Sequence, residues 1–319
     1  MSTPKQQFIQ VLETLPIAKG LIQSYRARQR QRDWSTAHHT QFGATSLHVF
    51  TTVGLGDIMI AKQLCDEFRE YCGRVGDPRL GRIVITAGAW PTEFVVERGD
   101  HNIYWWWSMN GQSNWLDNYI SKVNVRPDLV ACLSKWCVDQ AQSLGCKTVF
   151  MPLAAGARFC PLGLERRGIG YAGTKGHKDA SQVATVIGPF ERAPDFEWVD
   201  HYTTPEQLND FYNRKRIVLG MTETYQEMAG MVNNRVFEVL ATDTPFIISS
   251  HRSLGEVLGF EYPYQARTSE DAGRLAREIL NSYPAHQARF TEFGRRVRGE
   301  HSYRVRFNNL FERLSHNGR

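Results

Sequence analysis

The amino-acid sequence predicts an α/β protein with two Rossmann-like domains that face each other across a cleft. Three observations predict this fold class. The length of 319 residues exceeds what one hydrophobic core usually organises, so two domains are expected. Runs of β-branched and aromatic residues alternate with helical patterns, as in parallel βαβ units. A passage rich in Gly, Pro and Arg, "AAGARFCPLGLERRG" at 154–168, interrupts the alternation and suits a linker.

The first domain is expected over residues 46–160. Its β-branched first strand and a Gly-bearing turn lead into a helix with apolar residues at helical spacing. The expected strands are the apolar runs 47–53, 82–86, 102–108, 129–134 and 147–153, and further helices are expected over 113–122 and 135–144. Residues 1–45 are polar and basic, and we expect them to form a helix or an arm.

The second domain is expected over residues 166–319, where the alternation of strands and helices starts again. Its expected strands are 168–174, 196–200, 216–222 and 245–250, and its expected helices are 178–187, 205–213, 233–241 and others toward the end. Ligands of such sheets bind at the carboxyl ends of the strands. The cleft between the domains is therefore the expected site.

The composition is that of a soluble globular protein with a bias toward anionic partners. The formal charge is +5 and the pI is near 8.9. The N-terminus does not resemble a signal peptide, and no apolar run approaches the ~20 residues of a membrane span, so a cytoplasmic protein is expected. The six cysteines show neither a CxxC pair nor zinc-site spacing, which indicates buried free thiols.

The helix expected at 233–241 has the features of an anion site. Asn233 is a suitable N-cap, and Asn234, Arg235 and Glu238 share one polar face of the helix. Free backbone N–H groups at the helix start, together with Arg235, favour a phosphate, and Glu238 could accept hydrogen bonds from a ribose. The alternative is that Arg235 and Glu238 form an ordinary ion pair on the surface. Asp243, just past the helix, is expected in the left-handed conformation.

The second half resembles a known family. Its stretches "NNRVFEVLATDTPFIISSHRSLGEVLGF", "TSEDAGRLAREIL" and "HSYRVRFNNLFERL" resemble the C-terminal half of GT-B glycosyltransferases, most closely the CgeB-like, spore-maturation branch. The resemblance extends over roughly 166 to 315 and implies a GT-B fold. It also implies a nucleotide-sugar donor, with Arg235 near the diphosphate and Glu238 on the ribose.

The same resemblance extends to "GYAGTKGHKD" at 170–179. It implies that Gly173 allows a close approach to phosphate and that Lys175 or Lys178 neutralises the leaving diphosphate. Two departures from the family pattern stand out. Gly230 occupies the place of a second acidic residue, for which Glu223 or Glu227 could substitute, and Asp243 replaces a usual glycine.

A Gly-x-Gly turn, Gly54 and Gly56 in "TTVGLGDIMIAK", follows the first strand. It is not the GxGxxG of dinucleotide-binding proteins, which disfavours a nicotinamide dehydrogenase. The stretch resembles the acceptor loop of heptosyltransferase-like GT-B enzymes, and that resemblance implies that Asp57 faces the acceptor as a candidate general base. The alternative is that Asp57 only caps the following helix.

Aromatic residues at the strand ends of the first half are candidates for acceptor contacts. In "YWWWS" at 104–108, successive side chains point to opposite faces, so all are buried if both faces of the sheet are covered. Otherwise a ring such as Trp106 could stack on a sugar or base. Trp90 and Glu93 in the neighbouring turn "GAWPTEF" are further acceptor candidates.

The basic lead holds four arginines at alternate positions: Arg26, Arg28, Arg30 and Arg32. Such a stretch usually forms a solvated face. If functional, it would bind a polyphosphate such as DNA or RNA.

The sequence therefore predicts a glycosyltransferase that moves a sugar from a nucleoside diphosphate, with UDP expected, to a hydroxyl acceptor. The acceptor could be a hydroxymethylated base in DNA, as in phage-type enzymes, or a glycan. No Asp-x-Asp pair stands in a suitable loop, so neither a metal nor another cofactor is required. The alternatives are a nucleotide-sugar epimerase of the same fold and a non-catalytic nucleic-acid-binding module.

Overall fold

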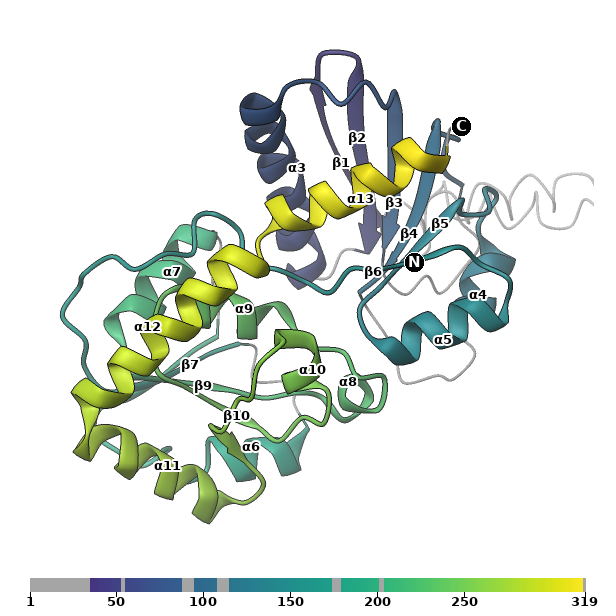
Figure 1. Cartoon of the computed structure of the whole chain (residues 1–319). Helices are drawn as coiled ribbons and strands as arrows, with labels where there is room; N and C mark the ends of the chain where they lie inside the picture. Colours follow the sequence, from purple (N-terminus) through teal and green to yellow (C-terminus); the bar gives the residue numbers. More distant parts are fainter. Residues whose placement is uncertain are drawn as a thin grey trace, which may run out of the picture.

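Two mainly parallel sheets, one in each half of the chain, form the computed structural model of this protein (Figure 1). The structure describes residues 35–52, 55–87, 95–107, 115–173, 179–200 and 204–317. The six-stranded sheet of the N-terminal half has the order β1-β2-β3-β4-β5-β6, and the five-stranded sheet of the C-terminal half has the order β11-β10-β9-β7-β8. The predicted mixed α/β class is confirmed.

The strands of the N-terminal sheet are β1 (Ser35–Phe42), β2 (Thr45–Thr52), β3 (Arg82–Ala87), β4 (His101–Trp106), β5 (Leu129–Cys132) and β6 (Thr148–Phe150). Its helices are α3 (Leu55–Val75), α4 (Trp115–Lys122) and α5 (Lys135–Ser143). From β2 to β6 every pairing is parallel, as expected for strands joined by helices.

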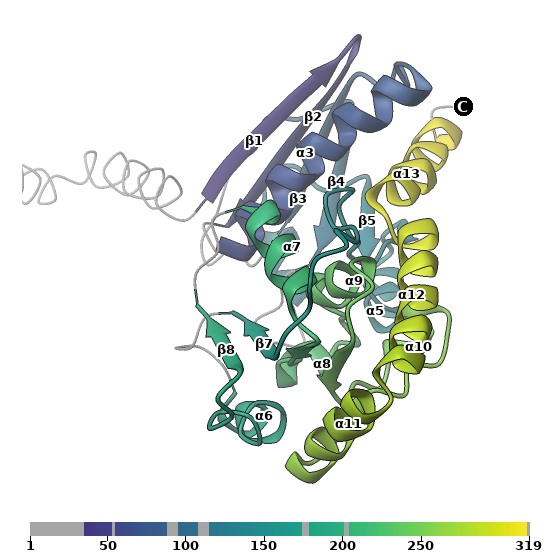
Figure 2. The same cartoon turned by 90° about the vertical axis from the view of Figure 1, so that its left-hand side faces the viewer.

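β1 falls within residues 1–45, which the sequence predicted to be a helix or an arm. It pairs antiparallel with β2 through a turn at Gly43, whose φ is +60°, and forms the outer edge of the sheet (Figure 2). Ala37 and His39 are exposed while Thr40 is buried, so the strand lacks the apolar alternation that would have revealed it. The prediction of a helix or an arm remains for residues 1–34, which lie outside the described part of the chain.

The C-terminal sheet is parallel throughout. Its strands are β7 (Ile169–Ala172), β8 (Phe196–Val199), β9 (Ile217–Gly220), β10 (Phe246–Ser249) and β11 (Gln265–Ala266). The helices that follow the linker are α6 (Ala180–Val186), α7 (Pro205–Arg214), α8 (Thr224–Met228), α9 (Asn234–Ala241), α10 (Leu254–Leu258), α11 (Ser269–Asn281), α12 (Tyr283–Glu300) and α13 (Tyr303–Asn317). Each predicted strand of this half has its counterpart.

The aromatic run at the end of β4 is fully buried. Trp105 and Trp107 belong to the core cluster on one face of the sheet, whereas Tyr104 and Trp106 belong to the cluster on the other. Each of the four side chains is at most 1% exposed, because helices cover both faces. Trp106 packs against Trp136 at 5.8 Å between ring centroids, so its predicted contact with an acceptor is wrong for this structure.

The chain crosses between the halves twice, and the two crossings run side by side. After α12 has packed along the C-terminal half, α13 continues onto α3 of the N-terminal half, where Phe68 meets Phe307 at 5.9 Å between centroids (Figure 1). At the crossings, the Ala155 N–H donates to the His301 carbonyl at 3.0 Å. The domain limits 46–160 and 166–319 stay predictions.

Arg306 fastens the crossings together. Its guanidinium, 5% exposed, donates to the carbonyls of Pro152 at 2.7 Å and Leu153 at 3.1 Å and to Nδ1 of His301 at 3.0 Å. Burial lowers the pKa of Arg306 to about 10, so the group stays charged at neutral pH. Burial and the Arg306 charge lower the pKa of His301 to about 4, which leaves a neutral ring whose Nε2 donates to the Leu258 carbonyl. The His-Ser-Tyr-x-x-Arg element thus has a structural role.

We expect Arg306→Ala to lower the free energy of unfolding by about 3 to 5 kcal/mol. The substitution leaves buried carbonyls without their charged donor. Arg313→Ala, on an exposed turn of the same helix, is the matched control and should change stability by less than ~0.5 kcal/mol. Chemical denaturation measures both. Equal stability of the two variants would contradict a structural role for Arg306.

Candidate active site

The candidate site lies where the order of the C-terminal sheet reverses. The chain runs from β7 to β8 on one side and then crosses to β9, β10 and β11 on the other. The switch point is therefore between β7 and β9, and α/β proteins bind ligands beside the carboxyl ends of such strands. Gly173 follows β7, Met221 follows β9, and the first turn of α9 lies next to them.

The first turn of α9 has no side-chain cap. Asn233 occupies the N-cap position, as predicted, with φ −73° and ψ 159°, but its side chain makes no capping hydrogen bond. Instead its Nδ2 donates to the Met221 carbonyl at 3.1 Å and ties the helix start to the end of β9. Its Oδ1 is buried and has no partner among the described residues. The backbone N–H groups at the positive end of this helix are therefore available to another hydrogen-bond acceptor.

Arg235 is fixed above an aromatic ring. Its guanidinium carbon lies 4.9 Å from the centroid of the Tyr171 ring, and Nη1 donates to the Tyr171 hydroxyl at 3.4 Å. A Cβ on Gly173 would lie 2.9 Å from Nη2 of Arg235 and 2.8 Å from the Tyr171 hydroxyl. Glycine at 173 therefore allows Arg235 to approach the end of β7, a contact that the sequence did not predict.

Glu238 is buried, with 2% of its surface exposed, and accepts a hydrogen bond from Asn234 Nδ2 at 2.8 Å. The alternative of an ordinary surface ion pair with Arg235 is therefore wrong. Burial raises the pKa of Glu238 to about 7, although the Asn234 hydrogen bond and the Arg235 charge both lower it. The carboxyl group can change its charge near neutral pH.

Asp57 lies in the first turn of α3 and faces the C-terminal half. Its Oδ1 accepts a hydrogen bond from Trp107 Nε1 at 3.0 Å. The pKa of Tyr225 in α8 is raised by burial and then by the negative charges of Glu223 and Asp57, which places Asp57 within electrostatic range of α8. The Ser134 hydroxyl, donating to the Ala229 carbonyl at 2.5 Å, joins the two halves beside this point.

Asp179 is a residue of this region that sequence analysis missed. It caps α6 and accepts a hydrogen bond from the Thr224 hydroxyl at 2.7 Å, which links the end of the "GYAGTKGHKD" segment to α8. Hydrogen bonds from Ser181 and Thr224 lower the pKa of Asp179 to about 2. An Asp directly before a helical pattern is the signal that could have revealed the cap.

The structure brings together a part of the predicted site. Gly173, Asn234, Arg235 and Glu238 lie together, and Asp57 of the other half lies within electrostatic range of Tyr225 in α8. Gly56 belongs to the first turn of α3. The remaining predicted residues lie outside the described part of the chain: Gly54, Trp90, Glu93, Lys175, Lys178, Arg26, Arg28, Arg30 and Arg32.

Residues 175–312 match a protein-family model described as glycosyl transferase-like. The C-terminal half is glycosyl transferase-like. This match confirms the resemblance that the motifs of that half predicted, and with it the expected class of enzyme, a glycosyltransferase. No curated protein matches the chain in sequence.

Solved structures agree in fold. The chain is similar to sucrose-phosphate synthase from Thermosynechococcus elongatus, with a TM-score of 0.50 and 13% identity, over 81% of this chain and 78% of that chain. It also aligns with AviGT4, a glycosyltransferase involved in avilamycin A biosynthesis, with a TM-score of 0.41 and 12% identity, over 80% of this chain and 88% of that chain. The predicted GT-B fold class is confirmed.

Among the described residues, no group of three or more His, Cys, Asp or Glu side chains is arranged to hold a metal ion. None of the described helices combines the length and the hydrophobicity needed to cross a bilayer.

We expect Glu238→Gln to change how stability depends on pH. Because the folded state raises the pKa of Glu238 from 4.5 to about 7, this group stabilises the fold fully below pH ~4.5, and the contribution is lost as the pH rises to ~7. Glutamine does not titrate. Between pH 4 and pH 8 the free energy of unfolding of the variant should therefore rise by about 2 to 3 kcal/mol relative to that of the wild type.

Thermal unfolding at a series of pH values measures this difference. Glu312→Gln, at an exposed position of α13, is the matched control and should follow the wild type. A constant offset between Glu238→Gln and the wild type across the whole range would contradict a titrating, buried Glu238.

Proposed function

We propose that the protein transfers a sugar from a nucleoside diphosphate sugar, with UDP the expected nucleotide, to a hydroxyl acceptor. The observation that carries this proposal is the arrangement at the switch point of the C-terminal sheet. There an uncapped helix start, the Arg235 guanidinium and a glycine at 173 converge, and a carboxylate of the other half, Asp57, lies within electrostatic range of α8.

The donor would bind to the C-terminal half. Its diphosphate would accept hydrogen bonds from the first turn of α9 and from Arg235, which the Tyr171 ring holds in place. Its ribose diol would donate a hydrogen bond to Glu238, whose Oε1 accepts one from the Asn234 amide in this structure. If a ribose hydroxyl replaces this amide as the donor, the buried carboxyl group still has a hydrogen-bond partner. Lys175 and Lys178, which follow β7 in the sequence, would add positive charge.

The acceptor would react from the side of the N-terminal half. Asp57 takes the proton of the acceptor hydroxyl, the oxygen attacks the anomeric carbon, and the bond from that carbon to the phosphate oxygen breaks. The electron pair leaves with the diphosphate, whose charge Arg235 and the helix start stabilise. The Trp107 hydrogen bond orients the Asp57 carboxylate for this step.

The acceptor itself is proposed on sequence alone. A hydroxymethylated base in DNA agrees with the arginines of the basic lead, and a glycan agrees with the aromatic residue Trp90 named from the sequence. Trp106 takes no part in this proposal, because its ring is buried.

We expect UDP to raise the melting temperature of the protein. The Gly173→Ala variant should need at least tenfold more UDP for the same rise. A ligand at 100 times its Kd adds about 2.7 kcal/mol of stability. A methyl group at 173 would displace Arg235 from Tyr171. Gly299→Ala is the matched control, because a Cβ at 299 meets nothing within 4 Å.

Thermal-shift titrations with UDP, GDP and ADP make the measurement. If none of these nucleotides stabilises the wild type, the donor site is not where we propose it. If a UDP-sugar is converted equally well with and without acceptors, the protein is an epimerase.

We expect Trp107→Phe to lower kcat by roughly tenfold, because the Asp57 carboxylate loses the indole N–H that orients it. Trp105→Phe is the matched control, because Trp105 Nε1 donates to the Met151 carbonyl at 2.9 Å instead. Asp57→Asn should lower kcat by 10²-fold or more. A kcat of Trp107→Phe equal to that of the wild type would count against Asp57 as the oriented base.

A further inference from the structure

A second cavity lies beside the two crossings, on residues that have no part in the proposed site. Its volume is about 230 Å³. One wall is formed by α3, a second by the linker residues 155–159, and a third by the junction of α12 and α13. We call this cavity the hinge pocket. It is several times larger than the ~30 Å³ that one water molecule takes, and a little smaller than pockets for drug-sized ligands, so its occupant is small.

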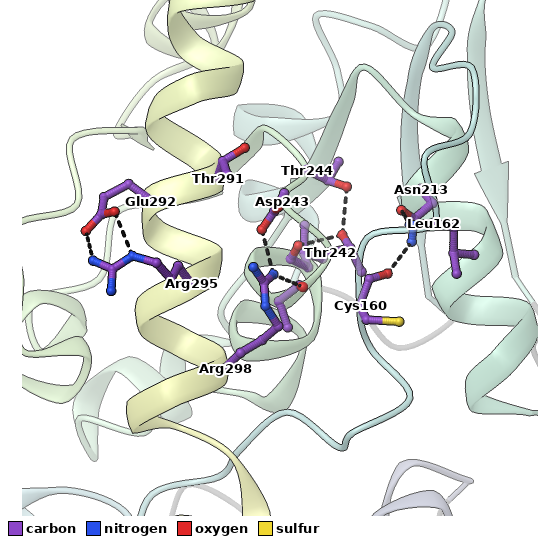
Figure 3. A network of polar contacts seen from close by, with 12 residues as sticks. Cys160, Leu162, Asn213, Thr242, Asp243, Thr244, Thr291, Glu292, Arg295 and Arg298 are labelled. Atoms are coloured by element: carbon purple, nitrogen blue, oxygen red, sulfur yellow. Dashed lines mark hydrogen bonds and ion pairs between the residues drawn. The ribbon is translucent and has the colours of Figure 1, made fainter.

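The charges around the hinge pocket leave one arginine without an acidic partner. Arg74 forms an ion pair with Glu70 on the same helix. Arg298 donates through Nη1 to Asp243 and to the Ala241 carbonyl, both at 2.6 Å (Figure 3). Arg304, in the first turn of α13, makes no ion pair or hydrogen bond with any of the described residues. The pocket therefore presents a positive charge that an anion can balance.

The carboxyl group of Glu67, which also lines the pocket, is partly protonated near neutral pH, so it carries less negative charge than an exposed glutamate. It is 9% exposed and accepts a hydrogen bond from the Ala157 N–H of the linker. Burial raises the pKa of Glu67 to about 7. Glu70 and Asp66 also raise it, while the Ala157 hydrogen bond and the Arg158 charge lower it. Tyr303 lies within electrostatic range as well.

An unpartnered hydroxyl and two aromatic rings complete the walls. The Oγ atom of Ser302 is buried and has no hydrogen-bond partner among the described residues. A buried hydroxyl without a partner is unfavourable, and a ligand oxygen would supply the missing hydrogen bond. Tyr71 and Phe159 supply apolar surface beside these polar groups.

We propose that the hinge pocket binds a small molecule with an oxyanion group, a phosphate or a carboxylate, held by Arg304, Arg298 and Ser302. The apolar part of this molecule packs against Tyr71 and Phe159. Because α3 belongs to the N-terminal half and the other walls belong to the crossings, the bound molecule adds contacts between α3 and the crossings. The pocket is thus a binding site separate from that of the nucleotide sugar.

Thermal unfolding of the full chain with inorganic phosphate or acetate tests this proposal, with chloride at equal ionic strength as the reference. We expect phosphate, acetate or both to raise the melting temperature of the wild type in a saturable way. Arg304→Ala should require at least tenfold more anion for the same shift, since it loses a charge-assisted hydrogen bond. Arg313→Ala on the same helix should behave as the wild type.

Two further variants separate this pocket from the donor site. Ser302→Ala should weaken the anion effect without unfolding the protein, and Arg235→Met should leave it intact. Anion stabilisation that is equal in the wild type and in Arg304→Ala, or is lost only in Arg235→Met, would overturn the hinge pocket as a site. The second of these outcomes would still support a phosphate site at α9.

Discussion

One buried guanidinium sets the relation between the two halves of this protein. Arg306 reaches from α13 to the carbonyls of Pro152 and Leu153, at the exact place where the chain leaves the N-terminal sheet. Carbonyl groups in an irregular, buried segment must find donors, and a charged donor with several N–H groups satisfies more than one of them. The position of the C-terminal sheet, and of Asp57 opposite α8, depends on this fastening because the crossings are the covalent connections between the halves.

The secondary structure could be predicted to a large extent from local patterns. The strands expected at 82–86 and 196–200 and the helix expected at 205–213 differ from the observed elements by one residue at most. Asp243 has φ +58°, the left-handed conformation expected just past α9. These features depend on neighbours along the chain, such as turn residues and apolar spacing, so the sequence displays them directly. The edge strand β1 was missed because its inward positions include the polar residues His38 and Thr40, so no apolar alternation marks it.

The geometry of the candidate site could be predicted only in part. The residue types and their positions on α9 followed from helical spacing. The contact of Arg235 with Tyr171 joins residues 64 positions apart, and the hydrogen bond of Asp57 with Trp107 joins residues 50 positions apart, so neither has a local signal. The burial of Glu238 was missed for a related reason: a helix face that looks polar in isolation is covered by elements from elsewhere in the chain. The burial of Trp106 was one of the two alternatives that the sequence left open, and the coverage of both sheet faces decides between them.

Two buried acidic groups whose pKa values are raised to about 7 come from elements on either side of the crossings. Glu67 comes from α3 in the N-terminal half and Glu238 from α9 in the C-terminal half, and Tyr303, the first residue of α13, lies within electrostatic range of both. The ring of Tyr303 packs edge-on to Trp105 at 6.3 Å, and Trp105 packs edge-on to Trp107 at 5.3 Å. Trp107 in turn holds Asp57. A continuous series of packed aromatic rings therefore connects the crossing to the candidate base, and close packing of this kind resists displacement. The same fastening that joins the halves thus also fixes the place of Asp57 relative to α9.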